Sequence, residues 1–245
     1  MNNILTYKIP KDKVKIIGIS DTHIGDPLFN KEKLIPYLEE ADYLILNGDL
    51  MNTATRNSVS FGYGSSPQQD LDMAVEIFKP YASKVLSIVE GNHEYRVAKE
   101  VGMSLTQLFA AQIGCLDKYC GDEGYLFLNI GPKQILYTLL HSHGFGGGRS
   151  VGAKANKLEG MAQGTEADIY MTSHTHQPLV FSQDHRTPHK QKKILQQITQ
   201  WFVNSGAFLS FGGYAVKFNF KPSSIITPII VLNGSKKEVE IAMKG

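Results

Sequence analysis

Cysteine, tryptophan and long apolar runs are scarce or missing in this chain of 245 residues. The two cysteines, Cys115 and Cys120, are too few and too close together for a disulfide framework, so a reducing, cytoplasmic setting is expected. No apolar segment is long enough to span a bilayer, and the first residues lack the basic and apolar regions of a signal peptide. We therefore expect no association with a membrane.

An excess of charge of one sign is also absent. The 25 Lys and Arg residues nearly balance the 23 Asp and Glu residues, which leaves a net charge of +2. This balance gives no general argument for a polyanionic partner, so a nucleic-acid role would need local evidence. Hydrophobic residues make up 42% of the chain, enough for a substantial core, and we expect a single domain over residues 1–245.

Apolar, β-branched runs alternate with helical patterns in the first half of the chain. The patterns predict strands at 14–20, 43–47 and 85–89, helices at 31–40, 68–81 and 97–113, and a long polar loop at 50–67. Such an alternation is typical of parallel strands joined by right-handed crossovers. A loop as long as 50–67 is more often functional than idle in a compact domain.

The pattern changes in the second half. It predicts a hairpin of 125–130 and 134–140 around Gly131-Pro132, a helix at 152–163, a strand at 169–172 and alternating runs at 194–203 and 225–232. The predicted fold class is therefore α/β (mixed α+β), with a parallel N-terminal half and a mainly antiparallel C-terminal half.

Acidic and histidine-bearing clusters directly follow several of these strands. They are Asp21-Thr22-His23, Gly48-Asp49, Gly91-Asn92-His93-Glu94 and His174-Thr175-His176, with a further histidine site at His141 or His143. Strands of one sheet can deliver such residues to a single edge, and carboxylate, imidazole and amide ligands suit divalent ions such as Zn, Mn or Fe. Ligands at positions i and i+2 fan apart in a turn and can address two ions, so the clusters predict a two-metal centre.

In order and spacing these motifs resemble the calcineurin-like metallophosphoesterase superfamily, over Ile16 to about Gln177. The resemblance implies a four-layer αββα sandwich that binds two divalent ions (Mn, Zn, Fe or Ni, with Mn favoured). It implies that one ion is held by Asp21, His23 and His176, the other by Asn92, His143 and His174, and that Asp49 bridges the pair.

Three positions need separate comment. His143 is favoured as the ligand because the family's histidine commonly precedes a glycine, which leaves His141 as a hydrogen-bonded or core histidine; the reverse assignment stays open. Ser173 stands where the family usually has glycine. Asn52 stands where several relatives have an aspartate paired with the catalytic histidine, and an amide cannot stabilise imidazolium as a carboxylate does.

The resemblance implies hydrolysis of phosphate esters by a hydroxide that bridges the two ions, with His93 donating a proton to the leaving oxygen. A phosphodiesterase is the leading expectation, with a nuclease as its more specific form. A phosphomonoesterase, a non-catalytic binding scaffold of the same fold and a mononuclear hydrolase are the alternatives. The site residues predicted for catalysis are His93 and Asn52.

Substrate choice is expected to come from loop arginines, because guanidinium groups pair bidentately with phosphate oxygens. The candidates are Arg56, Arg96 and Arg149, although each is as well explained as a solvated or structural residue. The loop segments also resemble a phage- or prophage-borne branch of the superfamily, which would place the protein in a host cytoplasm and make nucleic acid a partner to consider. The oligomeric state is left open.

Overall fold

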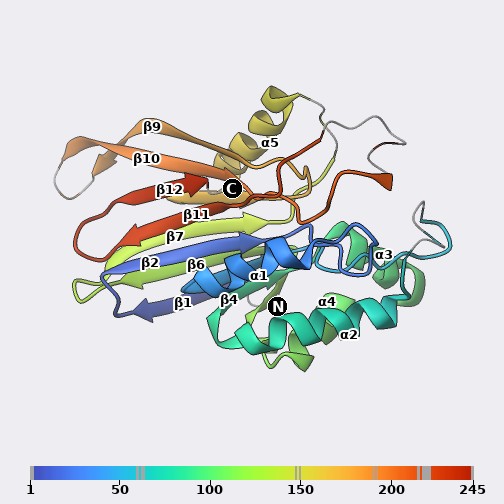
Figure 1. Cartoon of the computed structure of the whole chain (residues 1–245). Coiled ribbons are helices and arrows are strands. Elements are labelled where there is room, and N and C mark those ends of the chain that lie inside the picture. Colours follow the sequence, from blue (N-terminus) through green and yellow to red (C-terminus); the bar gives the residue numbers. More distant parts are fainter. Residues whose placement is uncertain are drawn as a thin grey trace.

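Two six-stranded mixed sheets lie face to face in the computed structural model of this chain (Figure 1). The structure describes residues 3–58, 61, 64–146, 148, 150–189, 191, 193–213, 216 and 222–243. One sheet has the strand order β12-β11-β2-β3-β4-β5, and the other has the order β1-β6-β7-β8-β10-β9.

The first sheet is parallel where the sequence predicts parallel strands. β2, β3, β4 and β5 run parallel to one another, whereas β11 is antiparallel to β2 and to β12. The strands of this sheet are β2 (Lys13–Ile19), β3 (Tyr43–Asn47), β4 (Val85–Val89), β5 (Tyr119–Gly121), β11 (Pro228–Asn233) and β12 (Val239–Met243). Every residue of β4 is buried, which is typical of a central strand covered on both faces.

The second sheet mixes both directions. β6–β7 and β9–β10 are antiparallel hairpins, but β8 is parallel to both β7 and β10. The helical crossover α5 joins β7 to β8, and the antiparallel strand β9 returns the chain between β8 and β10. Its strands are β1 (Ile4–Ile9), β6 (Glu123–Ile130), β7 (Ile135–Ser142), β8 (Ile169–Thr172), β9 (Leu179–His189) and β10 (Ile194–Asn204). The mixed α/β class expected from the sequence is confirmed.

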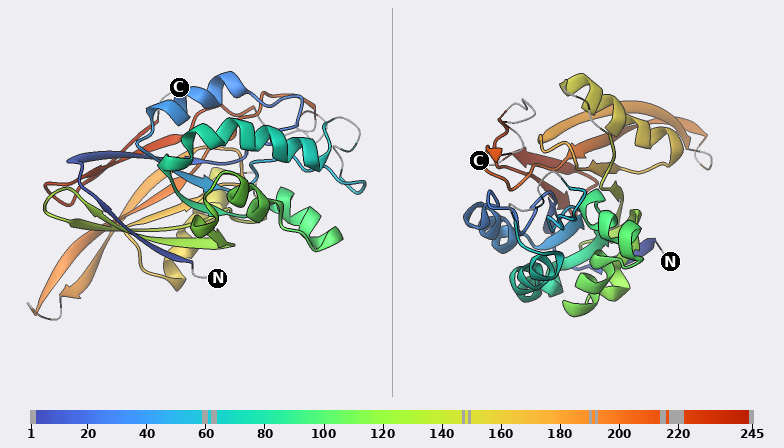
Figure 2. Two further views of the ribbon diagram at one scale, coloured as in Figure 1. Left: turned by 90° about the horizontal axis from the view of Figure 1, so that it is seen from below. Right: turned by 90° about the vertical axis from the view of Figure 1, so that its right-hand side faces the viewer.

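Three apolar clusters separate four layers. Ile16 and Leu126 belong to the core between the sheets, while Leu34 and Phe109 lie in the core under α1, α2 and α4, and Leu158 of α5 packs on the other sheet. Figure 2 shows helices on both outer faces of the sandwich. The αββα arrangement that the resemblance implies is therefore present. Among the described residues, no helix is both long and apolar enough to cross a membrane.

The helices are α1 (Lys31–Glu40), α2 (Pro67–Phe78), α3 (Asn92–Val101), α4 (Leu105–Gln112) and α5 (Val151–Gly164), with 3-10 helices at Lys79–Lys84 and Leu116–Lys118. The helix predicted at 97–113 is instead two helices. α3 ends at Gly102, whose φ of 71° is left-handed, and the Ser104 side chain then caps α4 by accepting from the Gln107 N–H. The Gly-Asn-His-Glu motif thereby becomes the first turn of α3 rather than a loop.

The core between the sheets should dominate the stability of the fold, and β7 offers a matched test. Leu139 is fully buried in this core, whereas Leu136, on the same strand, is 43% exposed. Leu139→Ala should lower the free energy of unfolding by about 2–5 kcal/mol through lost burial and a residual cavity. Leu136→Ala should change it by less than about 0.5 kcal/mol. Urea denaturation followed by circular dichroism measures both, and equal losses would contradict the assigned layering.

Candidate metal centre

The motif residues leave their strands at one end of the sandwich. Asp21 follows β2, Asp49 follows β3, Asn92 follows β4, and His143 and His174 follow β7 and β8. In Figure 1 the arrows of β2 and β7 point to the right, toward α3 and the loops gathered there. The two sheets thus contribute ligands to a common site from opposite sides.

Unusual backbone conformations mark these strand ends. Five of the predicted ligands have a positive φ, which non-glycine residues rarely adopt: Asp21 (48°), His23 (45°), Asp49 (49°), His174 (65°) and His176 (55°). Asp and His tolerate this region better than branched residues do, yet each such turn still costs free energy and must be held by its surroundings. The left-handed turns redirect the chain so that side chains from separate strands converge.

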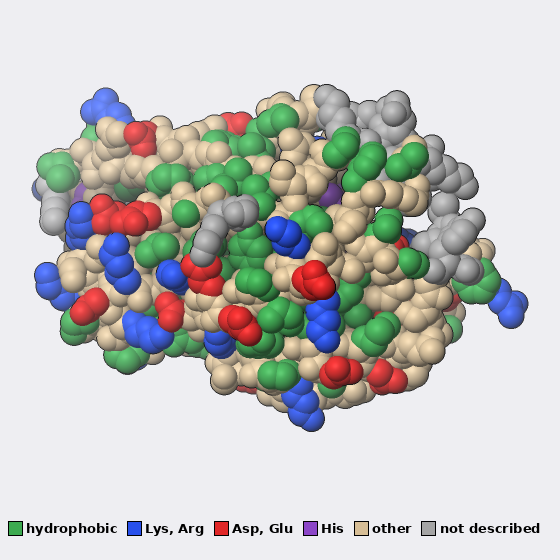
Figure 3. Space-filling model, viewed as in Figure 1, with side chains coloured by type: hydrophobic (Ala, Val, Ile, Leu, Met, Phe, Trp, Pro, Cys, Tyr) green, Lys and Arg blue, Asp and Glu red, His purple; other side chains and the backbone are tan. Residues whose placement is uncertain are grey.

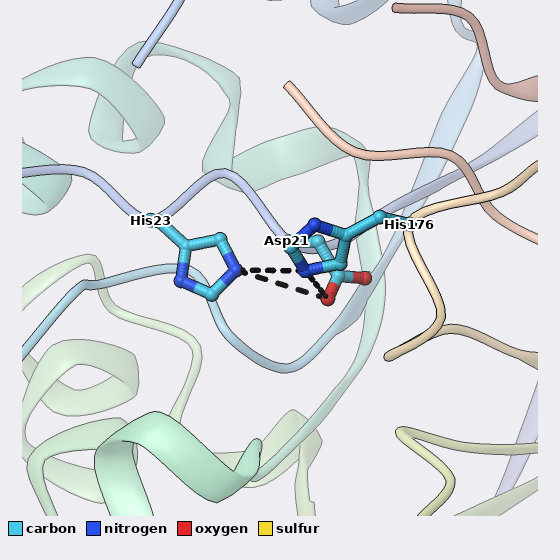
Figure 4. A group of neighbouring side chains, drawn as sticks. All are labelled: Asp21, His23 and His176. Atoms are coloured by element: carbon cyan, nitrogen blue, oxygen red, sulfur yellow. Dashed lines mark hydrogen bonds and ion pairs between the residues drawn. The ribbon is translucent and has the colours of Figure 1, made fainter. Parts of the chain in front are cut away.

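The first convergent group is Asp21, His23 and His176 (Figure 4). Nε2 of His23 and Nε2 of His176 are 3.2 Å apart, and Nε2 of His176 lies 3.2 Å from Oδ1 of Asp21. Oδ1 of Asp21 is buried and accepts no hydrogen bond from any described residue. A carboxylate oxygen without a hydrogen bond, facing two imidazole nitrogens, is a donor set that fits a divalent cation.

The second group is Asp49, His143 and His174. Nε2 of His143 lies 3.2 Å from Oδ2 of Asp49 and 3.2 Å from Oδ1 of Asn92. Asp49, His23 and His93 form a third, overlapping group, so Asp49 lies between the other two. The turn expected to separate i and i+2 ligands does so for His174 and His176, whereas Asp21 and His23 stay in one group.

All seven predicted metal ligands therefore meet in one continuous cluster, but their assignment to particular ions stays a prediction. Burial by itself would raise the pKa of Asp21, yet His176 and His143 lower the pKa to about 2. Burial also opposes ionisation of Asp49, and the imidazoles of His143 and His93 nevertheless keep its pKa well below the ordinary value. Two buried carboxylates are thus kept ionised side by side, an arrangement that calls for positive charge between them.

His93 lies beside this cluster with one ring nitrogen already engaged. Its Nδ1 is 2.9 Å from the main-chain oxygen of Asn52 and 3.2 Å from Nδ1 of His23. The side chain of Asn52, predicted as a catalytic group, does not make this contact, and among the described residues its Nδ2 has no hydrogen-bond partner. The carbonyl of residue 52 therefore occupies the place expected for a carboxylate, and the amide side chain does not.

His141 has a different environment from His143. Its Nδ1 is 2.8 Å from Oδ1 of Asn47 and its Nε2 is 2.8 Å from Oγ of Ser87, so both ring nitrogens are used within the protein. Burial lowers its pKa to about 3, which keeps the ring neutral. Asn47 in turn donates to Oγ of Ser173, so the serine that replaces the family's usual glycine has a structural partner.

Sequence reasoning missed the role of Glu94. Its carboxyl is fully buried and accepts from the N–H groups of Asp49 (3.1 Å) and Met51 (2.9 Å). Burial and the nearby Asp49 charge raise the pKa of Glu94 to about 8. The first turn of α3 thus contacts the Asp49 loop twice. The Glu94 carboxyl binds the loop backbone, and the His93 N–H donates to Oδ1 of Asp49 at 2.8 Å. The position of Glu94 in the motif was the only signal in the sequence.

Two further residues hold the loop that carries His174 and His176. The Nδ2 of Asn204 donates to Oγ1 of Thr175 at 2.9 Å and to the carbonyl of Gln177 at 2.8 Å. The Lys154 ammonium donates to the Gln177 side chain at 2.8 Å and to the Thr175 carbonyl at 3.4 Å. Lys154 is therefore half-buried against this loop.

The predicted substrate-binding arginines are less closely tied to the site. Arg56 is exposed in the loop after β3, and Arg96 donates to Oγ of Ser58 at 3.3 Å. Arg149 lies outside the described residues. Phe61, Tyr95 and Phe145 are exposed, at 52%, 48% and 83%.

A family model described as calcineurin-like phosphoesterase matches residues 14–178. A search of curated proteins finds no match.

Among solved structures, the chain is similar to a metallophosphoesterase from Sphaerobacter thermophilus, with 16% identity over 94% of this chain and 88% of that chain, at a TM-score of 0.44. It is similar to the phosphoesterase Yfce from E. coli, with 19% identity over 94% and 98% and a TM-score of 0.42. It is also similar to Vps29 from Entamoeba histolytica in complex with zinc, with 10% identity over 94% and 98% and a TM-score of 0.42.

The two neighbouring histidines of β7 and its loop can be told apart by metal content. Nε2 of His143 faces Asp49 and Asn92, so His143→Ala should reduce the bound manganese from two ions per chain toward one. His141→Gln should keep two ions but lower the melting temperature, because it loses a buried hydrogen bond to Asn47 or Ser87. Elemental analysis after dialysis from saturating manganese gives the stoichiometry. Retention of two ions by His143→Ala and loss of one by His141→Gln would reverse the assignment.

Proposed function

The chain belongs to the calcineurin-like phosphoesterase family, and from this premise we propose that it is a phosphodiesterase acting on small diesters, with manganese as the favoured metal. The observation that carries the proposal is the three overlapping His and Asp groups, which share Asp49 and His23 and so form one continuous site. Every ligand type that two divalent ions would need is present, which speaks against a non-catalytic scaffold.

In this proposal Asp21, His23 and His176 hold one ion and Asn92, His143 and His174 hold the other, with Asp49 shared. When bound, two divalent ions lower the pKa of water, orient a phosphoryl group and neutralise the charge on its oxygens. The protein itself provides a fixed donor set: Nδ1 of His143 is 2.8 Å from the carbonyl of Asn47, which leaves its Nε2 to face the cluster.

His93 is the proposed proton donor to the leaving oxygen. A carbonyl only accepts, so the proton on Nδ1 points at Asn52, and Nε2 is left on the side of Asp49, 3.9 Å from its Oδ2. The side chain is 18% exposed, so a substrate oxygen can reach it. His93 would hold a proton at Nε2 in the substrate complex and release it as the ester bond breaks.

A pocket beside the Asn92 and His143 side of the cluster supports a diester substrate. It has a volume of about 510 Å³ and is lined by Tyr95 and Phe145 as well as by both of these predicted ligands. A monoester offers only one organic group, whereas a diester has a second that needs space next to the phosphorus. The pocket provides that space at the edge of the cluster.

The charge of this pocket favours small substituents over polynucleotides. Glu90, Asp122 and Glu123 line it, and none of its lining residues is Lys or Arg. The phosphates of a nucleic acid require basic contacts, and carboxylates repel them. On the face shown in Figure 3, basic and acidic side chains of the described residues are interspersed and form no basic track. A neutral or cationic alcohol fits the pocket better.

Two substitutions separate metal binding from proton donation. Asp49→Ala should lose bound metal and activity together, because Asp49 is shared by two of the groups. His93→Ala should keep two manganese ions and lose about 10²- to 10⁴-fold in kcat, the usual contribution of a general acid. Elemental analysis gives the metal content, and hydrolysis of a dialkyl phosphate diester, whose alkoxide leaving group needs a proton donor, gives kcat on the same samples. A fully active Asp49→Ala variant would refute the two-metal proposal.

Charge in the pocket can be tested with a cationic substrate. The wild type should hydrolyse bis-p-nitrophenyl phosphate with a higher kcat/KM than p-nitrophenyl phosphate, and should prefer p-nitrophenyl phosphorylcholine over single-stranded DNA. Asp122→Asn/Glu123→Gln should lower kcat/KM for the choline ester by about tenfold and change the bis ester little, since only a cation gains from these carboxylates.

The matched control is Glu32→Gln/Glu240→Gln, which removes the same charge from exposed positions away from the pocket. Equal losses in both double variants would show a general charge effect. A preference for the monoester or for DNA would overturn the choice of substrate class.

A further inference from the structure

Asp70 is a buried carboxyl group that the proposed reaction does not use. It lies in the first turn of α2, has no exposed surface and makes no salt bridge with any described Lys or Arg. Burial raises its pKa to about 6. A buried carboxyl without a cation is costly, so the contacts that it makes are of interest.

These contacts reach the backbone of two ligand-bearing loops. Oδ2 of Asp70 accepts from the Thr53 N–H at 2.7 Å, and Oδ1 accepts from the Ser65 hydroxyl, which also lies 3.3 Å from the Gly25 carbonyl. Asp70 packs so closely on Gly25 that a β-carbon there would overlap its carboxyl. Through Asp70, α2 thus contacts both loops: it packs on Gly25 in the loop after Asp21 and accepts from Thr53 in the loop after Asp49.

Thr53 is the strained element in this arrangement. Its φ is 45°, a left-handed value that is a genuine outlier for a β-branched residue and persists only where the surroundings enforce it. The Asp70 carboxyl bonded to its N–H is such a restraint. On the other side, the Asn52 N–H donates to the Ile24 carbonyl at 2.9 Å, so the Met51–Asn52 peptide group is held as well.

The 52–53 segment makes two contacts with His93. The Asn52 carbonyl accepts from Nδ1 of the ring at 2.9 Å, and the Thr53 hydroxyl donates to the His93 carbonyl at 2.5 Å. One contact orients the ring, and the other fixes its backbone. A continuous path of buried hydrogen bonds therefore connects Asp70 to His93 without any contact between the two side chains.

We propose that Asp70 is a positioning residue for His93: through Thr53 it holds the Asn52 carbonyl where that oxygen accepts from Nδ1–H and so directs Nε2, which carries the second proton of the imidazolium form, to the substrate. This role rests on the proposed function of His93 as the proton donor. It also explains how the site works with an asparagine at position 52, because orientation comes from the main chain and the distant carboxyl maintains it.

Leaving-group dependence distinguishes positioning from mere folding. Departure of p-nitrophenolate needs little protonation, whereas an alkoxide leaving group needs a proton donor. Asp70→Ala should therefore lower kcat by about 10- to 100-fold on a dialkyl phosphate diester, from which only an alkoxide can leave, and by less than about threefold on bis-p-nitrophenyl phosphate. Its manganese content and KM should stay at the wild-type values.

The companion variants test the path itself. Asp70→Asn should restore kcat to within about threefold, because an amide can accept from Thr53 and donate to Ser65. Thr53→Gly, which adopts a positive φ without strain and is expected to fold, should reproduce the selective loss because it lacks the hydroxyl contact. Asp72→Ala, on an exposed position of the same helix, is the matched control for α2.

A double-variant cycle completes the test. If Asp70 acts through His93, Asp70→Ala/His93→Ala should be no slower than His93→Ala alone. Equal losses on both leaving groups, additive losses in the double variant or loss of manganese would overturn the proposal. Failure of the proposed function is a separate result, since the wild type itself would then show no manganese-dependent hydrolysis of any of these esters.

Discussion

The site depends on keeping two negative charges, those of Asp21 and Asp49, inside the sandwich. They follow adjacent parallel strands, β2 and β3, and are only 0% and 2% exposed. Buried carboxylates without compensating charge cost several kcal/mol, and here two of the imidazoles that face them, those of His143 and His176, come from loops of the opposite sheet. The packing of one sheet on the other is therefore also what brings the compensating groups to the two carboxylates.

A second constraint is the backbone conformation of the ligand loops. The left-handed residues at the strand ends store strain, and each loop is held by a buried polar side chain that does not itself face the cluster. The side chains that do this are Glu94 for the loop after β3, Asp70 for the 52–53 segment, Asn47 for Ser142 and Ser173, and Asn204 for the loop after β8. Such partners tune a metal site by fixing the geometry of its ligands.

The surroundings of the cluster differ on its two sides. Toward β8 and α5, Lys154 and Asn204 hold the loop that carries His174 and His176, and the Lys154 ammonium puts a positive charge beside this loop. Toward α3, the pocket is acidic and partly aromatic. In the function we propose, this asymmetry would orient a phosphate diester with its charged centre at the cluster and one organic substituent directed to the acidic pocket.

Local patterns in the sequence predict the elements that carry the motifs. α1 and β3 have the predicted bounds because their signals depend only on residues close in the sequence. β3 is a short apolar run, and α1 begins after Asn30, whose side chain accepts from the Lys33 N–H. The convergence of Asp21, Asp49 and Asn92 also follows from sequence, since ends of parallel strands share an edge. The histidines after β7 and β8 reach the same site only because the second sheet packs on the first. β1 and β12 were not predicted, because short edge strands with exposed alternate residues lack a strong local signal.

Only the tertiary structure decided how the site is supported. The carbonyl of Asn52 faces His93 where its side chain was expected, Glu94 reaches a loop 45 residues away, and Asp70 reaches one 17 residues away. Hydrogen bonds between a side chain and a distant backbone group leave no periodic trace in the sequence, because they depend on how separate loops lie against one another. The chain alone therefore determined which residues could bind metal, and the packing of its loops decided which residues hold them in place.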